Sequence, residues 1–232
     1  MPPQIGDFIS QRVYDGRLQS FPRHPITSRA IACRFVDTNG SEQPKGKSYK
    51  VSVVVVSKDD GSQLHRQNRE EVKAVTLIAE HLQEKGVPYR ILTPYDAQRD
   101  ALEKALKEKE LNWHDKCFSV DSFQGPFNIL RGLKNLLGLL THTSNRHAKT
   151  GNEDEFIVIS IVRTKKLGFL SDLRRTNVML TRCQRGMYVV SSKAFLEGRT
   201  GADSLVGKMA AELGNRPGAW LTQRDIEGGR FE

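Results

Sequence analysis

The chain has 232 residues, of which 38% are hydrophobic and 27% are charged. This composition is typical of a globular protein of one or two domains, and it excludes collagen-like and disordered chains. Lys and Arg number 36 against 27 Asp and Glu, and the charge of +9 favours a polyanionic partner, most simply nucleic acid. A basic surface without a ligand is the alternative.

Cysteine usage and hydropathy indicate where the protein acts. The three cysteines, Cys33, Cys117 and Cys183, are far apart and lack Cys-x-x-Cys spacing, so we expect reduced core residues rather than disulfides or a zinc site. His142 and His147 are wrongly spaced for one helical face, and no metal site is assigned. No signal peptide and no bilayer-spanning stretch are visible, which predicts a cytoplasmic or nuclear protein without a membrane partner.

A strand is predicted over 30–36, followed by a stretch that comes close to a phosphate-binding loop. Gly40, however, lies one residue too far from the Gly-Lys-Ser triplet at 46–48, and Pro44 removes an N–H donor. A phosphate-binding loop opens into a helix, whereas the β-branched run at 51–56 predicts a strand. We therefore expect a polar loop here rather than an ATP site.

Strands and helices alternate through the rest of the chain. Apolar residues recur at helical spacing up to Gly86, and Asp96 is placed to cap the following helix. In chain order the pattern predicts a helix over 69–85, a strand over 89–92, a helix over 97–109 and strands over 117–120, 156–162 and 187–191. This alternation predicts an α/β domain with a mainly parallel sheet flanked by helices.

Polar residues follow three of these strands. They are Thr93 and Pro94 after the first, residues 121–125 after the second, and Arg163 and Thr164 after the third. Ligands of parallel sheets bind at the carboxyl ends of the strands, so we expect these loops to meet at one rim. Turn and capping residues are the alternative reading of each position taken alone.

The stretch "LRRTNVMLTRCQRGMYVV", residues 173–190, concentrates arginines near a helix-like segment over 174–183 that ends against a strand. Arg182 is the sharpest candidate, because a guanidinium is always charged and can bind two oxygens of a γ-phosphate. A surface salt bridge is the alternative for a lone arginine.

Five ordered blocks resemble one family over nearly the whole chain: "MPPQIGDFISQRVYDGRLQS", "ILTPYDAQRDAL", "SVDSFQG", "NEDEFIVISIVRT" and "GFLSDLRRTNVMLTRCQRGMYVVSS". They are similar to motifs IV to VI of the Upf1-like superfamily 1 helicases, in the second RecA-like domain. The resemblance implies a RecA-like domain of the P-loop NTPase type over 30–200. Residues 1–29 would belong to the end of motif IV, and 201–232 to a C-terminal tail.

In that family ATP and Mg²⁺ lie between two RecA-like lobes and are held chiefly by the first. The resemblance implies that Arg182 is the catalytic arginine that reaches the γ-phosphate, and that Gln124, Gly125 and Glu153 border the nucleotide. No Walker A loop or Walker B pair is visible, and the chain starts inside motif IV, so we expect no ATP hydrolysis by this chain alone. The first lobe, of the same or a neighbouring chain, is thus an implied partner.

The resemblance also implies a nucleic-acid site, made of Thr93, Pro94, Ser122, Arg163 and Thr164. These residues would contact the backbone of single-stranded RNA or DNA, which suits a motor that steps along any sequence, in the 5′ to 3′ direction by resemblance. We further expect the loops at one edge of the sheet to converge, so that Arg182 and the segment around Gln124 border the same nucleotide.

Two segments depart from the family pattern, 51–67 and 126–151. Our hypothesis is that both are insertions without a catalytic role. They would be introns that were wrongly included in the coding sequence of a predicted gene. An apolar stripe in the second segment, Leu130, Leu133, Leu137 and Leu140, could be a partner-binding or membrane-surface helix, although packing or local disorder is favoured.

Two other functions remain open from the sequence. One is a non-catalytic nucleic-acid-binding or regulatory module derived from a helicase. The other is a nuclease-linked or splicing-associated helicase, which the motifs do not distinguish from the first interpretation.

Overall fold

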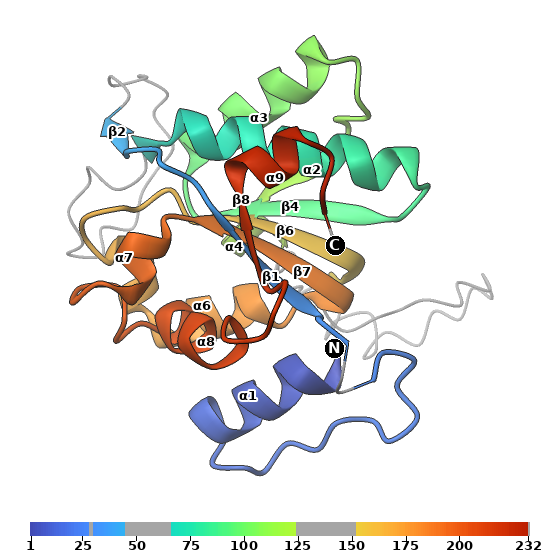
Figure 1. The fold of residues 1–232 in the computed structure, drawn as a ribbon, viewed down its shortest axis with the longest axis vertical. Helices are drawn as coiled ribbons and strands as arrows, with labels where there is room; N and C mark the ends of the chain where they lie inside the picture. Colours follow the sequence, from blue (N-terminus) through green and yellow to red (C-terminus); the bar gives the residue numbers. More distant parts are fainter. Residues whose placement is uncertain (28–29, 45–65, 124–151, 232) are drawn as a thin grey trace, which may run out of the picture.

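The computed structural model describes residues 1–27, 30–44, 66–123 and 152–231 (Figure 1). Its centre is a six-stranded sheet of order β5-β4-β6-β7-β1-β8, in which every neighbouring pair is parallel. Helices cover both faces of the sheet. The predicted α/β class with a parallel sheet flanked by helices is therefore confirmed.

The middle strands are dense in Val and Ile, because a strand that is covered on both faces must be apolar along its length. The six strands of the sheet are β1 (Cys33–Asp37), β4 (Tyr89–Thr93), β5 (Cys117–Ser119), β6 (Asp154–Ser160), β7 (Cys183–Ser191) and β8 (Trp220–Thr222). A separate two-stranded antiparallel ribbon pairs β2 (Gln43–Pro44) with β3 (Arg66–Gln67). Arg66 and Gln67 are the described part of the suspected insertion at 51–67.

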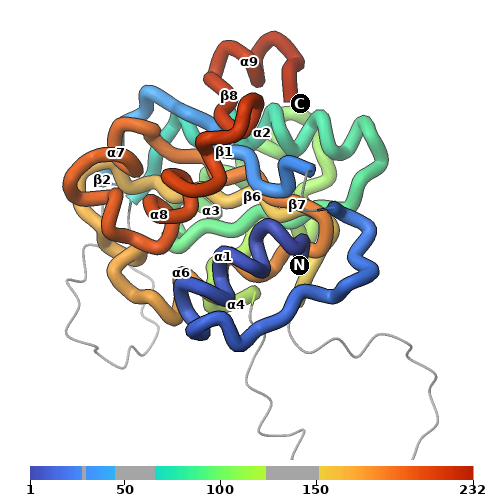
Figure 2. The backbone as a smooth tube through the Cα atoms, turned by 60° about the horizontal axis from the view of Figure 1, so that its bottom comes forward, coloured from blue at the N-terminus to red at the C-terminus, as the bar shows by residue number. Residues whose placement is uncertain are grey.

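Two hydrophobic clusters, one on each face, attach the helices to the sheet. On one face lie α2 (Arg69–Glu84), α3 (Asp96–Glu108) and α9 (Gln223–Glu227) (Figure 1). The other face carries α1 (Pro3–Val13), α4 (Val120–Phe123), η2 (Gly168–Ser171), α6 (Leu173–Leu180), α7 (Lys193–Glu197) and α8 (Leu205–Leu213). In Figure 2, α1 runs beside α6, and the Asn177 amide donates to the Tyr14 hydroxyl at 2.9 Å between them.

Within the described residues, the predicted helices and strands form, with shifted bounds at several strands and two further differences. The helix-like segment expected to reach Cys183 ends at Leu180, because Cys183 already pairs with Asp154 at the start of β7. Asp96 was expected to cap α3, but Tyr95 is the N-cap and Asp96 pairs with Arg99 at 3.1 Å. The strand expected at 51–56 and the leucine stripe from Leu130 lie outside the described residues.

Both terminal segments contribute to the domain. Ile5, Phe8 and Ile9 of α1 are fully buried in one cluster. The segment 201–232, assigned to a tail, supplies α8, β8 and α9, and the ring of Trp220 lies 5.0 Å from that of Phe35.

The three cysteines are buried and free, as predicted. Among the described residues, no helix has the length and apolar character needed to cross a bilayer.

Replacing Phe35 by alanine tests the packing of the sheet. Phe35 is 0% exposed, so Phe35→Ala should lower the free energy of unfolding by about 3–5 kcal/mol through lost burial and the cavity left behind. Phe21, at 66% exposed, is the matched control, and Phe21→Ala should cost less than about 0.5 kcal/mol. Urea denaturation of both variants measures the difference, and equal losses would contradict this core.

Candidate functional site

The strands all run in one direction, so the sheet has a carboxyl edge and an amino edge. The carboxyl edge is formed by residues 93–95, 119–123 and 162–168, which follow β4, β5 and β6. The amino edge is formed by residues 153–155 and 182–185, where β6 and β7 begin. Each edge holds some of the candidate nucleotide-binding and nucleic-acid-binding residues predicted from the sequence.

Arg182 lies at the amino edge, immediately before β7. The expectation that it shares one edge with the loops after the strands is wrong for the loops that the structure describes, because those loops lie at the carboxyl edge. Gln124 and Gly125 lie outside the described residues, so their approach to Arg182 stays a prediction. Glu153, in contrast, does lie at the same edge as Arg182.

Arg182 and Glu153 are held by the start of the β6–β7 ladder. The backbone N–H of Asp154 donates to the Arg182 carbonyl at 3.2 Å, and Gln184 Nε2 donates to Glu153 Oε2 at 3.3 Å. Burial lowers the pKa of the half-buried Arg182 guanidinium, and the Glu153 carboxylate acts in the opposite direction.

The Arg182 side chain is fixed at one point. Its Nε donates to the carbonyl of Val178, one turn back in α6, at 2.9 Å. Within the described part of the chain, its two terminal nitrogens donate no hydrogen bond. This leaves the fork of the guanidinium able to bind an anion.

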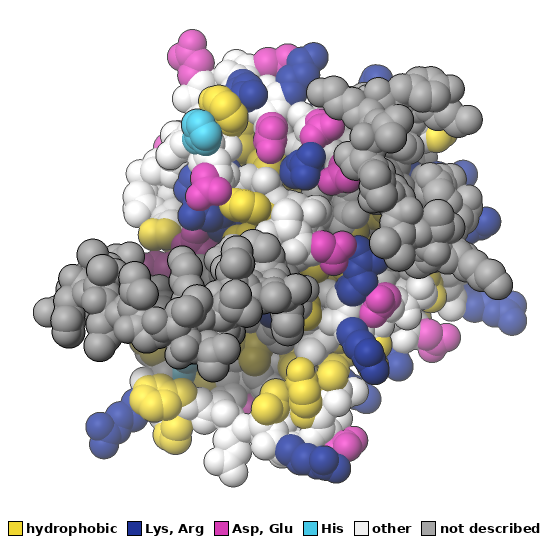
Figure 3. All heavy atoms as spheres, turned by 180° about the vertical axis from the view of Figure 1, so that it is seen from behind, with side chains coloured by type: hydrophobic (Ala, Val, Ile, Leu, Met, Phe, Trp, Pro, Cys, Tyr) yellow, Lys and Arg dark blue, Asp and Glu magenta, His cyan; other side chains and the backbone are white. Residues whose placement is uncertain are grey.

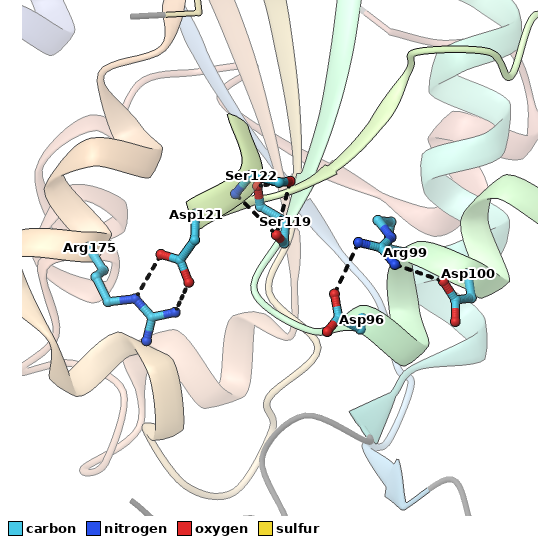
Figure 4. Close-up of polar contacts among 7 residues, drawn as sticks. All are labelled: Asp96, Arg99, Asp100, Ser119, Asp121, Ser122 and Arg175. Atoms are coloured by element: carbon cyan, nitrogen blue, oxygen red, sulfur yellow. Dashed lines mark hydrogen bonds and ion pairs between the residues drawn. The ribbon is translucent and has the colours of Figure 1, made fainter. Parts of the chain in front are cut away.

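At the carboxyl edge, α4 follows β5 directly and presents hydroxyls (Figure 4). Ser119 Oγ donates to Ser122 Oγ at 3.0 Å, Ser122 Oγ donates to the Ser119 carbonyl at 3.0 Å, and Ser122 is exposed. Beside them, Asp121 accepts two hydrogen bonds from Arg175 of α6, at 3.1 and 2.5 Å. The guanidinium of Arg175 also lies 4.6 Å from the centre of the Phe169 ring.

The loop after β6 turns Arg163 inward. Arg163 is 4% exposed; its Nε donates to the Lys166 carbonyl at 3.0 Å and lies 3.2 Å from Glu42 Oε2. Gly168, at φ +52°, allows this packing, since a Cβ there would lie 2.8 Å from the Tyr95 hydroxyl and 3.1 Å from the Arg163 guanidinium. Arg163 therefore supports the loop from inside, and direct contact with a ligand would require it to become exposed.

The other predicted nucleic-acid residues differ in accessibility. Thr164 is half-buried, and its hydroxyl accepts from the Glu42 N–H at 3.4 Å. Thr93 and Pro94 are buried, and the Thr93 hydroxyl has no hydrogen-bond partner among the described residues. Ser122 and Thr164 are thus the two of these five side chains that a ligand can reach directly.

A buried polar network lies under this edge. Glu71 of α2 is 0% exposed, and its carboxylate accepts from Ser160 Oγ at 2.6 Å, from Asn68 Nδ2 at 3.2 Å and from the Val162 N–H at 3.0 and 2.9 Å. Gln98 Nε2 donates to Ser160 Oγ at 2.9 Å, which directs the hydroxyl proton of Ser160 toward Glu71. The network ties the starts of α2 and α3 to the end of β6.

Val162 has a left-handed backbone, with φ +69°. The Arg163 N–H donates to the Ile161 carbonyl at 2.8 Å, which closes a three-residue γ-turn around Val162. A β-branched residue in this conformation is strained by about 1–3 kcal/mol, so the surroundings must hold it in place. The Glu71 carboxylate does so through the Val162 N–H.

Glu71 is a functional candidate that the sequence marks only by a local helix signal. Asn68 followed three residues later by Glu71 is the spacing of a capping box at a helix start. The Asn68 side chain does cap α2, accepting from the Glu71 N–H. The onward bonds of Glu71 to β6 are tertiary contacts that the spacing does not reveal.

Burial raises the pKa of the Glu71 carboxyl from 4.5 to about 8, against the opposing effect of its hydrogen bonds from Ser160 and Val162. Glu70, its neighbour, has its pKa lowered by hydrogen bonds from Lys73 and Gln223. Among the described residues, no group of three His, Cys, Asp or Glu side chains could hold a metal ion.

Electrostatics alone do not single out one surface. On the face shown in Figure 3, Lys and Arg side chains are interspersed with Asp and Glu. At the carboxyl edge, Lys165 and Lys166 are both exposed, beside the polar groups described above. The candidate sites therefore rest on the two edges rather than on one broad basic patch.

Comparison with known proteins gives a family match over most of the chain. A family model described as an AAA domain matches residues 1–127 and 142–194. The unmatched residues between these ranges fall inside the suspected insertion at 126–151, whose nature stays a prediction.

Three of the curated relatives that match the chain are named as helicases. An uncharacterized ATP-dependent helicase of Methanocaldococcus jannaschii is 31% identical over 147 residues, 63% of this chain and 18% of the relative. A putative ATP-dependent RNA helicase of Saccharomyces cerevisiae is 27% identical over 225 residues, 84% of this chain and 19% of the relative. The ATP-dependent helicase upf1 of Schizosaccharomyces pombe is 26% identical over 207 residues, 84% and 19% respectively. The chain thus spans about a fifth of the length of these relatives.

The Glu71 carboxyl should make the stability of the chain depend on pH. Its pKa of about 8 in the folded state exceeds 4.5, so the folded state binds more protons between these values and stability falls as pH rises. The stabilisation is complete below pH 4.5 and is lost as the pH passes about 8, at up to about 1.4 kcal/mol per pH unit. Urea denaturation at several pH values should show this slope in the wild type and not in Glu71→Gln.

Glu70→Gln is the matched control. The lowered pKa of Glu70 makes its own contribution change only as the pH falls through its acidic range, so this variant should keep the wild-type slope between about pH 5 and pH 8. A Glu71→Gln variant with the full wild-type slope would contradict the assignment.

Proposed function

We propose that this chain is the second lobe of a nucleic-acid motor. The premise is that the chain belongs to the AAA domain family, as the second RecA-like domain of an Upf1-like superfamily 1 helicase. Its carboxyl edge binds the backbone of single-stranded RNA or DNA. Its amino edge supplies Arg182 to an ATP site, whose other wall is a first RecA-like lobe of the same or a neighbouring chain.

The placement of Arg182 carries this proposal. Its guanidinium is anchored through Nε at the end of α6, and its terminal nitrogens make no hydrogen bond to the described residues. An arginine in this state can bind two oxygens of a γ-phosphate and neutralise the charge that develops as the phosphoryl group leaves. Glu153, oriented by Gln184, stands beside it as the candidate partner of the nucleotide ribose.

ATP and Mg²⁺ are the cofactors of the proposal, held mainly by the first lobe. The magnesium ion would neutralise the phosphates there, while this chain contributes Arg182, Glu153 and, by resemblance, Gln124 and Gly125.

The carboxyl edge supports a sequence-independent contact with a single strand. Ser122 and Thr164 are accessible hydroxyls, and Lys165 and Lys166 add charge next to them. Hydroxyls and ammonium groups suit phosphate and sugar, which are shared by every sequence. In this proposal Thr93 and Pro94 form the floor of the contact, and Arg163 holds the loop through Glu42.

Salt dependence of binding tests the nucleic-acid edge. The chain should bind fluorescent single-stranded RNA and DNA of mixed sequence with similar affinity in an anisotropy titration. If Lys165 and Lys166 contact phosphates, the double alanine variant should lose about 0.7 per lysine from the slope of log affinity against log salt. The control pair, Lys85→Ala and Lys107→Ala, lies where α2 and α3 end and should keep the wild-type slope.

Two results would contradict the nucleic-acid edge. One is a chain that does not bind single strands at any salt concentration. The other is an equal change of slope in both pairs of lysine variants, which would indicate a diffuse charge effect.

ATP hydrolysis tests Arg182. This chain alone should show no turnover, and a protein that combines it with a first lobe bearing Walker A and Walker B should hydrolyse ATP when a single strand is present. There, Arg182→Ala should lower kcat by about 10³-fold with little change in KM, and Arg182→Lys should not restore it, because an ammonium group cannot bridge two oxygens.

Arg185→Ala is the matched control, since Arg185, in β7, lies at the same edge of the sheet as Arg182 but pairs with Glu155 at 2.9 Å. Its activity should remain near that of the wild type. Full activity of Arg182→Ala would favour a non-catalytic nucleic-acid-binding module, and turnover by the chain alone would refute the two-lobe site. A cytoplasmic or nuclear location stays a prediction.

A further inference from the structure

Thr164 stands two residues after the left-handed turn at Val162, so the turn decides where Thr164 and the exposed lysines after it are presented. Val162 itself is fully buried in one hydrophobic cluster. Its side chain anchors the loop to the core while its backbone adopts a conformation that valine disfavours. Glycine would accept the backbone conformation but would give up the anchor.

The backbone of the turn is held by the hydrogen bonds between the Val162 N–H and the Glu71 side chain. Both oxygens of the Glu71 carboxylate accept from the Val162 N–H, at 3.0 and 2.9 Å. If Val162 relaxed to an extended conformation, this N–H would turn away from Glu71. The carboxylate would then lose one of its three donors while remaining 0% exposed to water.

The carboxylate is itself held from two further directions. Ser160 Oγ donates to it at 2.6 Å and in turn accepts from Gln98 Nε2, while Asn68 Nδ2 donates at 3.2 Å. Gln98 also accepts from the Asn68 N–H at 2.8 Å. Glu71 cannot shift without breaking this network, so its position is fixed by two helices and a strand.

We propose that Glu71 is a positioning residue of the carboxyl edge: its carboxylate holds the left-handed turn at Val162 and thereby sets where Thr164, Lys165 and Lys166 meet a single strand. Glu71 is buried and does not touch the nucleic acid, so it acts through Val162. The inference rests on the proposed function of this edge for its consequence in binding, but the restraint on the turn can be measured without any nucleic acid.

A double-variant experiment separates positioning from simple support of the core. Above the Glu71 pKa of about 8, where the carboxyl is ionised, Glu71→Gln replaces one carboxylate oxygen with an NH₂ group that faces the donors, so affinity for a fluorescent mixed-sequence single-stranded RNA should fall about tenfold. Val162→Gly adopts the turn without strain and should bind within about threefold of the wild type, although it is less stable. The double variant should bind like Val162→Gly, because its turn no longer needs Glu71.

A purely structural role predicts a different pattern. The losses caused by the two substitutions would then add, and the double variant would bind no better than Glu71→Gln. That result would overturn the proposal. Glu70→Gln, at the neighbouring half-buried position of α2, is the matched control and should bind like the wild type.

Hydrogen exchange without nucleic acid provides the independent readout. The amides of residues 162–166 should exchange faster in Glu71→Gln than in the wild type, with the central strands unchanged. Unchanged protection of this segment would overturn the inference, whatever the binding result. A wild-type chain that binds no single strand would refute the proposed function, while faster exchange in Glu71→Gln would still support the restraint on the turn.

If Glu71→Gln fails to fold, Ser160→Ala takes its place, because it removes a donor that orients the carboxylate. It should weaken RNA binding by about threefold and be rescued by Val162→Gly. Wild-type binding and wild-type exchange in Ser160→Ala would overturn the proposal.

Discussion

Because all six strands run in one direction, the sheet places one set of functional side chains at its carboxyl edge and another at its amino edge. Among the described residues, those that directly follow a strand emerge at the carboxyl edge, and those that directly precede one emerge at the amino edge. The described hydroxyls and lysines after β5 and β6 therefore lie at the opposite edge from Arg182, which precedes β7. Helix α6 spans the distance between the edges: Arg175 in its first turn binds Asp121, and Arg182 follows its last turn.

Two buried ionisable residues fix the shape of the carboxyl edge. Glu71 and Arg163 are both nearly inaccessible to water, and each is retained because several groups satisfy it at once. Such groups are poor sources of net stability, since the cost of desolvation offsets much of their attraction. Their value here is geometric, because they fix a loop that apolar packing alone would leave in several arrangements.

Much of the fold could be predicted from the sequence, because density in Val and Ile marks covered strands and helical spacing marks α2 and α3. The edge occupied by Arg182 was misjudged, since nothing local shows that Cys183 already belongs to a strand. The burial of Arg163 was equally hidden, because its partner Glu42 is distant in the sequence. Arg182 could be predicted from its chemistry and from the family motif, and Ser122 from its place after a strand and from the family motif. Glu71 depends on tertiary contacts that spacing does not encode.

The outermost strands of the described sheet, β5 and β8, are also its shortest, with three residues each. A parallel sheet with long free margins offers rows of unsatisfied peptide groups to any passing chain, and self-association through such margins is a common route to aggregates. Here the tapering of the sheet leaves few such groups on either side. We therefore expect the described sheet to be a poor template for edge-to-edge association.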